Sequence, residues 1–205
     1  MIEKEKYKKM LEKYGTTSSW AIWELPGSTV KSNTESLRWV KNPDLLKIIN
    51  TGYVFVGLNI AGTHGDQDGH FQKPWANFHS GYSYQNDYKL RFALQDTKYW
   101  GSYITDVIKN YPEVESGKVK QYLNRHPEVI LSNIRNFEEE LSYLGNKPVL
   151  VAMGGETNRI LNKYLGDRYK VVVIKHYSYT ISKENYRKEV LAVLDSVKNE
   201  CLHEY

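Results

Sequence analysis

Tyr53-Val54-Phe55-Val56-Gly57-Leu58 is the most informative segment for the fold, because it is a continuous run of mostly apolar, β-forming residues between Gly52 and Asn59. A strand with one face in solvent alternates apolar and polar side chains, and this run does not alternate. Continuous apolar runs are typical of strands buried on both faces, as in parallel sheets covered by helices. The run therefore predicts a central strand of an α/β domain.

The segments around this run alternate between strand and helix patterns. Other apolar, β-forming segments predict further strands at residues 99–107, 148–153 and 169–174. Helical spacing and stop signals predict helices at residues 1–14, 84–95, 127–144, 157–165 and 182–197. Weaker patterns indicate an extended segment at 20–25 and helical stretches at 36–40 and 44–49. We therefore expect a three-layer α/β/α sandwich around a four-stranded parallel sheet, with ligands bound at the carboxyl ends of the strands.

Length and composition fit a single domain over residues 1–205. The chain is 40% hydrophobic and 25% charged, and no apolar run approaches the ~18 residues of a membrane span. We expect a cytoplasmic monomer that does not enter a membrane. Its single cysteine, Cys201, excludes disulfides and cysteine-ligated clusters within one chain. The net charge of +4 favours a polyanionic partner only weakly, because much of the excess lies in lysines near the N-terminus.

Four short motifs stand at the expected carboxyl ends of the strands or in the loop that follows the first. In chain order they are Gly57-Leu58-Asn59-Ile60-Ala61-Gly62, Pro74-Trp75-Ala76-Asn77-Phe78, Ile104-Thr105-Asp106-Val107-Ile108-Lys109 and His176-Tyr177-Ser178. The first two resemble the Gly-Ile-Asn-Pro-Gly and Pro-Ala-Asn-x-Phe motifs of the mismatch-specific branch of the uracil-DNA glycosylase superfamily. The third is similar to the strand end that follows there, and the fourth stands where other branches have His-Pro-Ser. The resemblance covers roughly residues 53–182.

This resemblance implies a DNA glycosylase that flips a deaminated or damaged base out of DNA and hydrolyses its N-glycosidic bond without metal or cofactor. It implies that Asn59 positions the water, that Phe78 stacks on the base, and that His176 donates a hydrogen bond to the departing base. The other residues that the motifs suggest are Asn77, Gly57 and Leu58 for base binding, and Ser178, Tyr179 and Ile181 for DNA binding, with Ser178 on a phosphate and Tyr179 or Ile181 as a wedge.

Departures from the family's motifs bear on the activity. Ile60 and Tyr177 stand where the family has proline, so neither loop is stiffened in the same way. Asp106 stands where several branches carry a base-reading asparagine. An ionised carboxylate can accept a hydrogen bond from uracil N3–H but cannot donate one to O4, so a changed substrate or a lost activity would follow. Asp106 can alternatively act as the base for the water, which requires that its pKa stay low.

Three of the site residues also have a purely structural interpretation. Asn59 is a common residue in a turn after a strand, Phe78 can fill the core under the long segment from residue 59 to 81, and Asp106 can cap the next segment through its side chain.

Two other functions remain open. The chain can be a weak or inactive relative that binds nucleic acid or a nucleotide through the same pocket. It can also be a metal-dependent hydrolase that uses the loop from His64 to His79. That loop offers imidazole and carboxylate ligands from His64, Asp66, Asp68, His70 and His79, although their spacing fits no compact helical motif and lacks the remaining ligands of a calcium loop.

Overall fold

The computed structural model describes residues 2–60, 72–82, 84–113, 115–145 and 147–200. The helices in this part of the chain are α1 (Lys4–Tyr14), the 3-10 helix η1 (Arg38–Lys41), α2 (Leu45–Ile48), α3 (Asp87–Leu94), α4 (Ser116–Arg125), α5 (Pro127–Ser142), α6 (Gly155–Leu165) and α7 (Lys183–Glu200). The strands are β1 (Ser18–Trp20), β2 (Asn50–Asn59), β3 (Ser102–Ile108), β4 (Val149–Met153) and β5 (Val171–Ile174).

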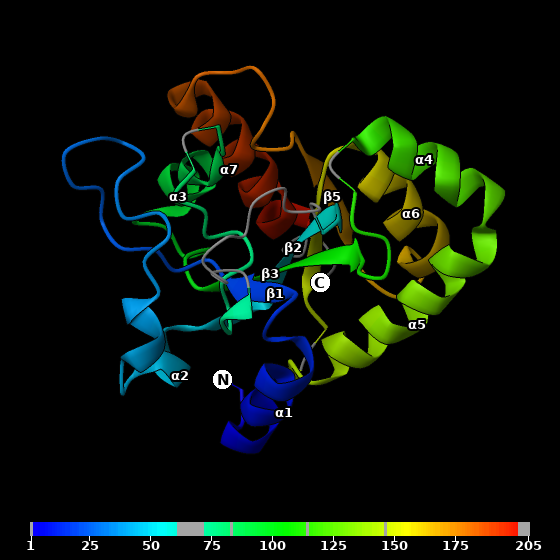
Figure 1. Cartoon of the computed structure of the whole chain (residues 1–205), viewed down its shortest axis with the longest axis horizontal. Helices are drawn as coiled ribbons and strands as arrows, with labels where there is room; N and C mark the ends of the chain where they lie inside the picture. Colours follow the sequence, from blue (N-terminus) through cyan, green and yellow to red (C-terminus); the bar gives the residue numbers. More distant parts are fainter. Residues whose placement is uncertain (1, 61–71, 83, 114, 146, 201–205) are drawn as a thin grey trace.

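The strands form one mixed sheet in the order β1-β3-β2-β4-β5 (Figure 1). Neighbouring strands from β3 to β5 are parallel, whereas β1 pairs with β3 in the antiparallel direction at the edge. The α/β class is confirmed, but the prediction of a sheet with only four parallel strands is wrong. The segment Ser18-Ser19-Trp20 is too short for a periodic signal, and its pairing comes from β3, which lies far along the chain. The extended segment expected at residues 20–25 overlaps with β1 only at Trp20.

β2 lies at the centre of the sheet, as its apolar run predicts. Val54, Phe55 and Val56 are each 0% exposed, because β3 and β4 flank the strand and helices cover both of its faces. From β2 the chain passes to β3 on one side and then crosses to β4 and β5 on the other. The carboxyl ends of β2 and β4 therefore flank the point where the direction of winding reverses, which is where open α/β sheets bind ligands.

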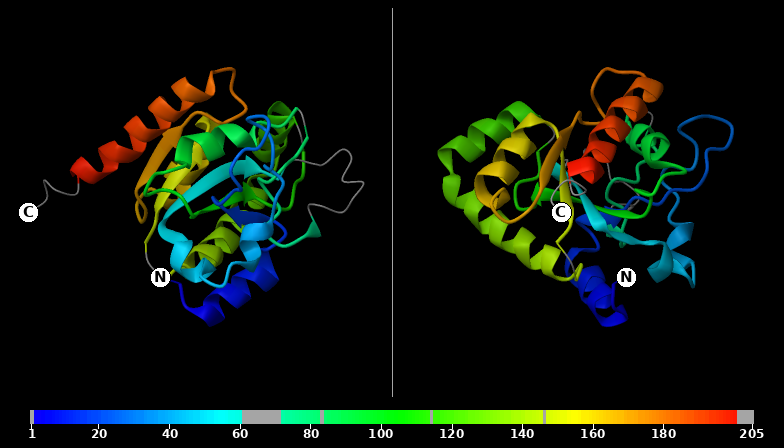
Figure 2. Two further views of the ribbon diagram at one scale, coloured as in Figure 1. Left: turned by 90° about the vertical axis from the view of Figure 1, so that its left-hand side faces the viewer. Right: turned by 180° about the vertical axis from the view of Figure 1, so that it is seen from behind.

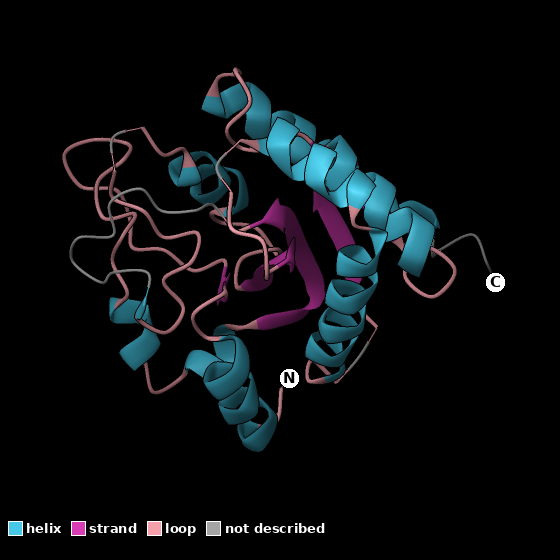
Figure 3. Cartoon of the chain, turned by 45° about the vertical axis from the view of Figure 1, so that its right-hand side comes forward, coloured by secondary structure: helices cyan, strands magenta, loops and turns pink. Residues whose placement is uncertain are grey.

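Helices cover both faces of the sheet, which gives three layers (Figure 3). On one face, Phe55, Ile104 and Val151 belong to an apolar cluster with residues of α3 and α7. On the other face, Val54 and Val56 belong to a cluster with residues of α1, α4, α5 and α6. The long helix α7 runs beside α3, both in Figure 1 and in the view from behind in Figure 2.

The helices agree with the sequence where the apolar pattern is strong. α5 begins at Pro127 as predicted. Ser182 caps α7, because its Oγ accepts a hydrogen bond from the Asn185 N–H over 3.2 Å. α4 was not predicted, and the stretch at 36–40 forms only the short 3-10 helix η1. Within the described residues, no helix is long and apolar enough to cross a membrane.

Candidate functional site

Asp106 lies at the centre of a buried group near the carboxyl end of β3. It pairs in register with Gly57 of β2 and is only 4% exposed. Asn77 Nδ2 donates a hydrogen bond to Asp106 Oδ2 over 3.3 Å and to the Thr17 carbonyl over 2.9 Å. The structure thus brings together Gly57, Asn77 and Asp106, which come from three different motifs.

Gly57 allows Asp106 and Phe78 to approach β2 closely. A Cβ atom at this position would lie 2.2 Å from Asp106 Oδ1 and 3.7 Å from Phe78 Cε1. Phe78 has a left-handed backbone with φ of 64°, which is uncommon for an aromatic residue. Its ring is 7% exposed and belongs to the apolar cluster with α3 and α7. Phe78 therefore both fills the core, as its structural interpretation predicts, and lies beside the carboxyl group of Asp106.

Burial raises the pKa of Asp106 to about 7, because removal from water disfavours the charged form. The positive charge of Lys109 and the hydrogen bond from Asn77 oppose this rise, and the negative charge of Glu140 adds to it. The raised pKa corrects the expectation that Asp106 is an ordinary ionised carboxylate. It also contradicts the alternative that Asp106 is the base for the water, because that role requires a low pKa. A protonated carboxyl group offers one O–H donor and one acceptor oxygen. The objection that Asp106 cannot donate a hydrogen bond to a base therefore applies only at alkaline pH.

Tyr177 extends this group from the turn after β5. Burial raises the pKa of its phenol well above the usual value, and the charges of Asp87 and Asp106 raise it further. Asp87 is 4% exposed, accepts a hydrogen bond from the Ser80 N–H over 2.8 Å, and has a pKa raised to about 6 by burial. No sequence pattern points to Asp87, because an acidic residue in the first turn of a helix is ordinary.

His176 is held as a neutral imidazole in the same turn. The Ser178 N–H donates a hydrogen bond to His176 Nδ1 over 3.2 Å, and Ser178 Oγ lies 2.7 Å from the same nitrogen. Because Nδ1 accepts, the proton of the neutral ring stays on Nε2. Burial lowers the pKa of His176 to about 4, so the ring is neutral near pH 7. A Cβ on Gly154, at the end of β4, would lie 4.0 Å from His176 Cβ, which places His176 at the carboxyl edge of the sheet.

Asn59 lies at the end of β2, and its amide nitrogen is hydrogen-bonded to the backbone. Its Nδ2 donates hydrogen bonds to the carbonyls of Ile60, Tyr111 and Glu113 at 3.0, 3.3 and 2.7 Å. These bonds tie the end of β2 to the segment after β3, so Oδ1 is the side-chain atom left to orient a water. The half-buried side chain of Leu58 packs against the apolar cluster of α5 and α6, on the face of the sheet opposite Phe78.

The residues predicted to contact DNA line one open depression of about 540 Å³. Tyr179 is 56% exposed there, and its carbonyl accepts a hydrogen bond from Lys89 Nζ over 2.9 Å. Ser178, Tyr179 and Ile181 are therefore brought together, although through one turn of the chain. The full lining is Asn86, Tyr88, Lys89, Ser178, Tyr179, Thr180, Ile181 and Ser182.

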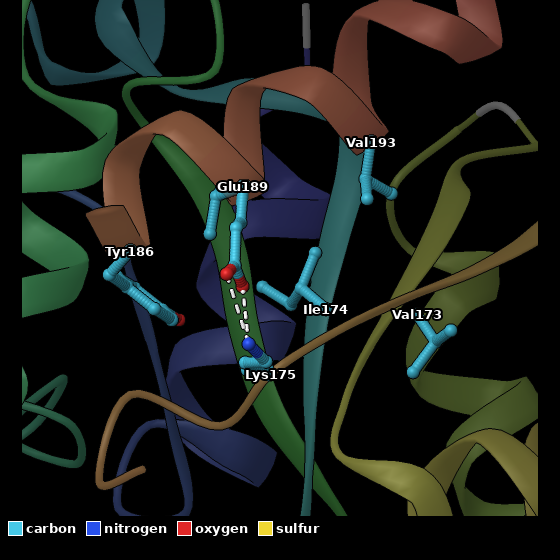
Figure 4. A pocket seen from close by; sticks show the side chains of 7 residues that line it. Val173, Ile174, Lys175, Tyr186, Glu189 and Val193 are labelled. Atoms are coloured by element: carbon cyan, nitrogen blue, oxygen red, sulfur yellow. Dashed lines mark hydrogen bonds and ion pairs between the residues drawn. The ribbon is translucent and has the colours of Figure 1, made fainter. Parts of the chain in front are cut away.

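A smaller cavity of about 140 Å³ lies between β5 and α7 (Figure 4). Its walls are mostly valine and isoleucine side chains, and Lys175 and Glu189 form an ion pair beside it at 2.9 Å. Tyr186 reaches it from α7, and the Tyr186 hydroxyl is buried without a hydrogen-bond partner in the described part of the chain. None of the predicted site residues lines this cavity.

The loop considered for metal binding falls mainly outside the described residues, since His64, Asp66, Asp68 and His70 are not among them. His79 is described and is 0% exposed. Its ring packs against Trp23 and Trp39, with ring centroids 5.1 and 5.5 Å away. Elsewhere in the described ranges, no group of three or more histidine, cysteine, aspartate or glutamate side chains could hold a metal ion.

Comparisons of the chain with protein-family models, with curated proteins and with solved structures gave no match. The function must therefore be argued from the residues and their geometry.

Proposed function

We propose that the chain is a DNA glycosylase of the uracil-DNA glycosylase type, which flips a deaminated, uracil-like base out of DNA and hydrolyses its N-glycosidic bond. One observation carries this proposal. Gly57, Asn77, Phe78 and Asp106 form one mostly buried group near the carboxyl ends of β2 and β3, next to the reversal of winding, and motif resemblance points to all four. The four parallel strands β3-β2-β4-β5, with helices on both faces, also support the proposal, because such a fold is expected to have this core. β1 is an additional antiparallel strand at the edge of this core.

Phe78 and Asp106 account for recognition of the base. Phe78 supplies the ring that would stack on the base, and the absence of a side chain at Gly57 lets this ring and the carboxyl group of Asp106 lie together against β2. When protonated, that carboxyl group can accept a hydrogen bond from uracil N3–H and donate one to O4. Its pKa of about 7 leaves much of it protonated at neutral pH. Asp106 can thus do what an asparagine amide would do.

His176 and Asn59 account for the cleavage step. The bond between sugar C1′ and the base nitrogen breaks, its electron pair leaves with the base, and the oxygen of a water bonds to C1′ and releases its proton to the surrounding solvent. The Nε2–H of neutral His176 stabilises the negative charge on the departing base, a contribution of about 3–4 kcal/mol for one preorganised donor. Asn59 Oδ1 orients the water, because the Asn59 amide nitrogen is already bonded to backbone.

The test uses oligonucleotides that carry uracil, hypoxanthine or a mismatched thymine, and measures abasic-site formation at several pH values. If Asp106 reads the base as a protonated acid, wild-type activity falls as the pH rises through about 7. Asp106→Asn then keeps the activity and removes this fall, since an amide donates and accepts at every pH. Loss of all activity in Asp106→Asn would instead identify Asp106 as the base for the water. Asp87→Asn is the matched control, because it also removes a buried carboxyl group.

The second candidate function is binding of nucleic acid without cleavage. The hydrogen bonds from Asn59 Nδ2 to backbone carbonyls favour it, because they give Asn59 a structural role. A protein of this kind would release no base from any of the three substrates. It would still bind an oligonucleotide with a flipped or abasic nucleotide, and Phe78→Ala would weaken that binding. Release of base by the wild type together with its loss in Asn59→Ala would rule this candidate out.

A further inference from the structure

Four tyrosines lie at or next to the depression that Ser178 and Tyr179 line, two of them exposed and two half-buried. The rings of Tyr82 and Tyr84 are stacked, with centroids 5.4 Å apart and an interplanar angle of 6°, and Tyr84 is 64% exposed. Asn86 Nδ2 donates a hydrogen bond to the Tyr84 carbonyl over 3.4 Å, so this pair adjoins the wall of the depression. Tyr88 and Tyr179 belong to the wall itself. We call these four residues the tyrosine surface.

Lysine side chains accompany the tyrosine surface. Lys31 Nζ lies 5.3 Å from the centroid of the Tyr88 ring. Lys89 belongs to the wall, and its pKa is lowered by burial and by the nearby charge of Lys31, so the two cations lie close together. Lys175 Nζ lies 5.2 Å from the Tyr179 ring but is shared with Glu189. None of the described residues that line the depression is acidic, so its local charge suits a polyanion.

Two residues that line the depression are chain neighbours of residues close to Asp106. Asn86 and Ser178 line the depression. Asp87 follows Asn86 and Tyr177 precedes Ser178, and the charge of Asp87 raises the pKa of Tyr177, so these two side chains lie close together. Tyr177 in turn lies within electrostatic reach of Asp106. A strand that lies along the depression would therefore pass next to the group that we assign to the flipped base.

We propose that the tyrosine surface binds single-stranded DNA beside the target nucleotide, so that the preferred substrate is a base in a single-stranded region. Exposed flat rings stack on unpaired bases, whereas the bases of a duplex already stack on one another. Lys31 and the hydroxyl groups of Ser178, Thr180 and Ser182 would contact the phosphates, and the charge of Lys89, whose Nζ already donates to the Tyr179 carbonyl, would add to the attraction. This inference rests on the proposed function for the base in the Asp106 group, but binding of the strand itself requires no cleavage.

The experiment is fluorescence anisotropy of the full chain with a labelled, undamaged thymidine oligonucleotide of about 15 nucleotides, and with the matching duplex. We expect the single strand to bind at least about tenfold more tightly than the duplex. Tyr84→Ala and Tyr179→Ala should each weaken binding of the single strand by about tenfold, and Tyr84→Phe should not. Tyr164→Ala is the matched control: Tyr164 also has a lysine over its ring, Lys163 at 5.1 Å, but it lies on α6, against the opposite face of the sheet.

Equal affinity for the single strand and the duplex would overturn the inference. So would wild-type affinity in Tyr84→Ala and Tyr179→Ala, provided that both variants unfold thermally like the wild type. The two proposals can fail separately. Tight, tyrosine-dependent binding of the undamaged strand without release of any base would support this inference and count against the glycosylase. If uracil is released at the same rate by the wild type, Tyr84→Ala and Tyr179→Ala, the glycosylase is supported and this inference is contradicted.

Discussion

Replacing Asp106 by asparagine should stabilise the protein at alkaline pH. Asp106 is 4% exposed, and burial raises its pKa from 3.8 to about 7. Between these two values the folded state binds more protons than the unfolded state, so the free energy of unfolding falls as the pH rises from about 4 through about 7. The difference of about three between the two pKa values corresponds to about 4 kcal/mol. An amide is neutral at every pH, and its oxygen can still accept the hydrogen bond from Asn77.

The assay is urea unfolding of the wild type and Asp106→Asn between about pH 5 and pH 8, compared at each pH. We expect the variant to be more stable at pH 8 by up to about 4 kcal/mol, and the advantage to shrink as the pH falls. Asp87 has a pKa of about 6 and contributes to both proteins, so it cancels in the difference. Asp87→Asn serves as a control, because its effect should be complete at a lower pH. An advantage that is absent at pH 8, or constant over the whole range, would refute the raised pKa of Asp106.

Other substitutions test the contacts around the site. Gly57→Ala should destabilise the protein by about 1–3 kcal/mol, because the new Cβ would lie 2.2 Å from Asp106 Oδ1, and urea unfolding that matches the wild type would contradict this close approach. Asn59→Ala should lower the free energy of unfolding by about 1–2 kcal/mol through loss of the bonds to Ile60, Tyr111 and Glu113, and an unchanged value would mean that these bonds do not form. Arg91→Leu should lower it by about 3 kcal/mol and expose residues 24–32 to proteolysis, since the buried guanidinium donates to the Glu24, Val30 and Ser32 carbonyls; unchanged protease resistance would argue against this. Chelation of divalent metal should leave base release unchanged, whereas stoichiometric zinc in the purified protein would favour the hydrolase that uses the loop from His64 to His79.

The sequence alone was sufficient for the main strands and the long helices. The runs that became β2, β4 and β5 are continuously apolar, and the helices α5 and α7 repeat apolar residues at helical spacing. Such patterns reflect which faces must be buried, and they can be recognised within one segment of the chain. Motif order also singled out Gly57, Asn77, Phe78 and Asp106, which meet in the folded chain.

How these residues can act depends on contacts made in the folded protein. The pKa of Asp106 depends on burial and on charges from Lys109 and Glu140, and Tyr177 joins the group from a distant turn. No pattern around Asp106 contains that information, because the environment of a buried carboxyl group is assembled from segments far apart in sequence. The edge strand β1 and the backbone bonds of the Asn59 amide are non-local in the same sense. Periodicity specified the layers of the fold, while the protonation and the partners of the site residues depend on contacts that exist only after folding.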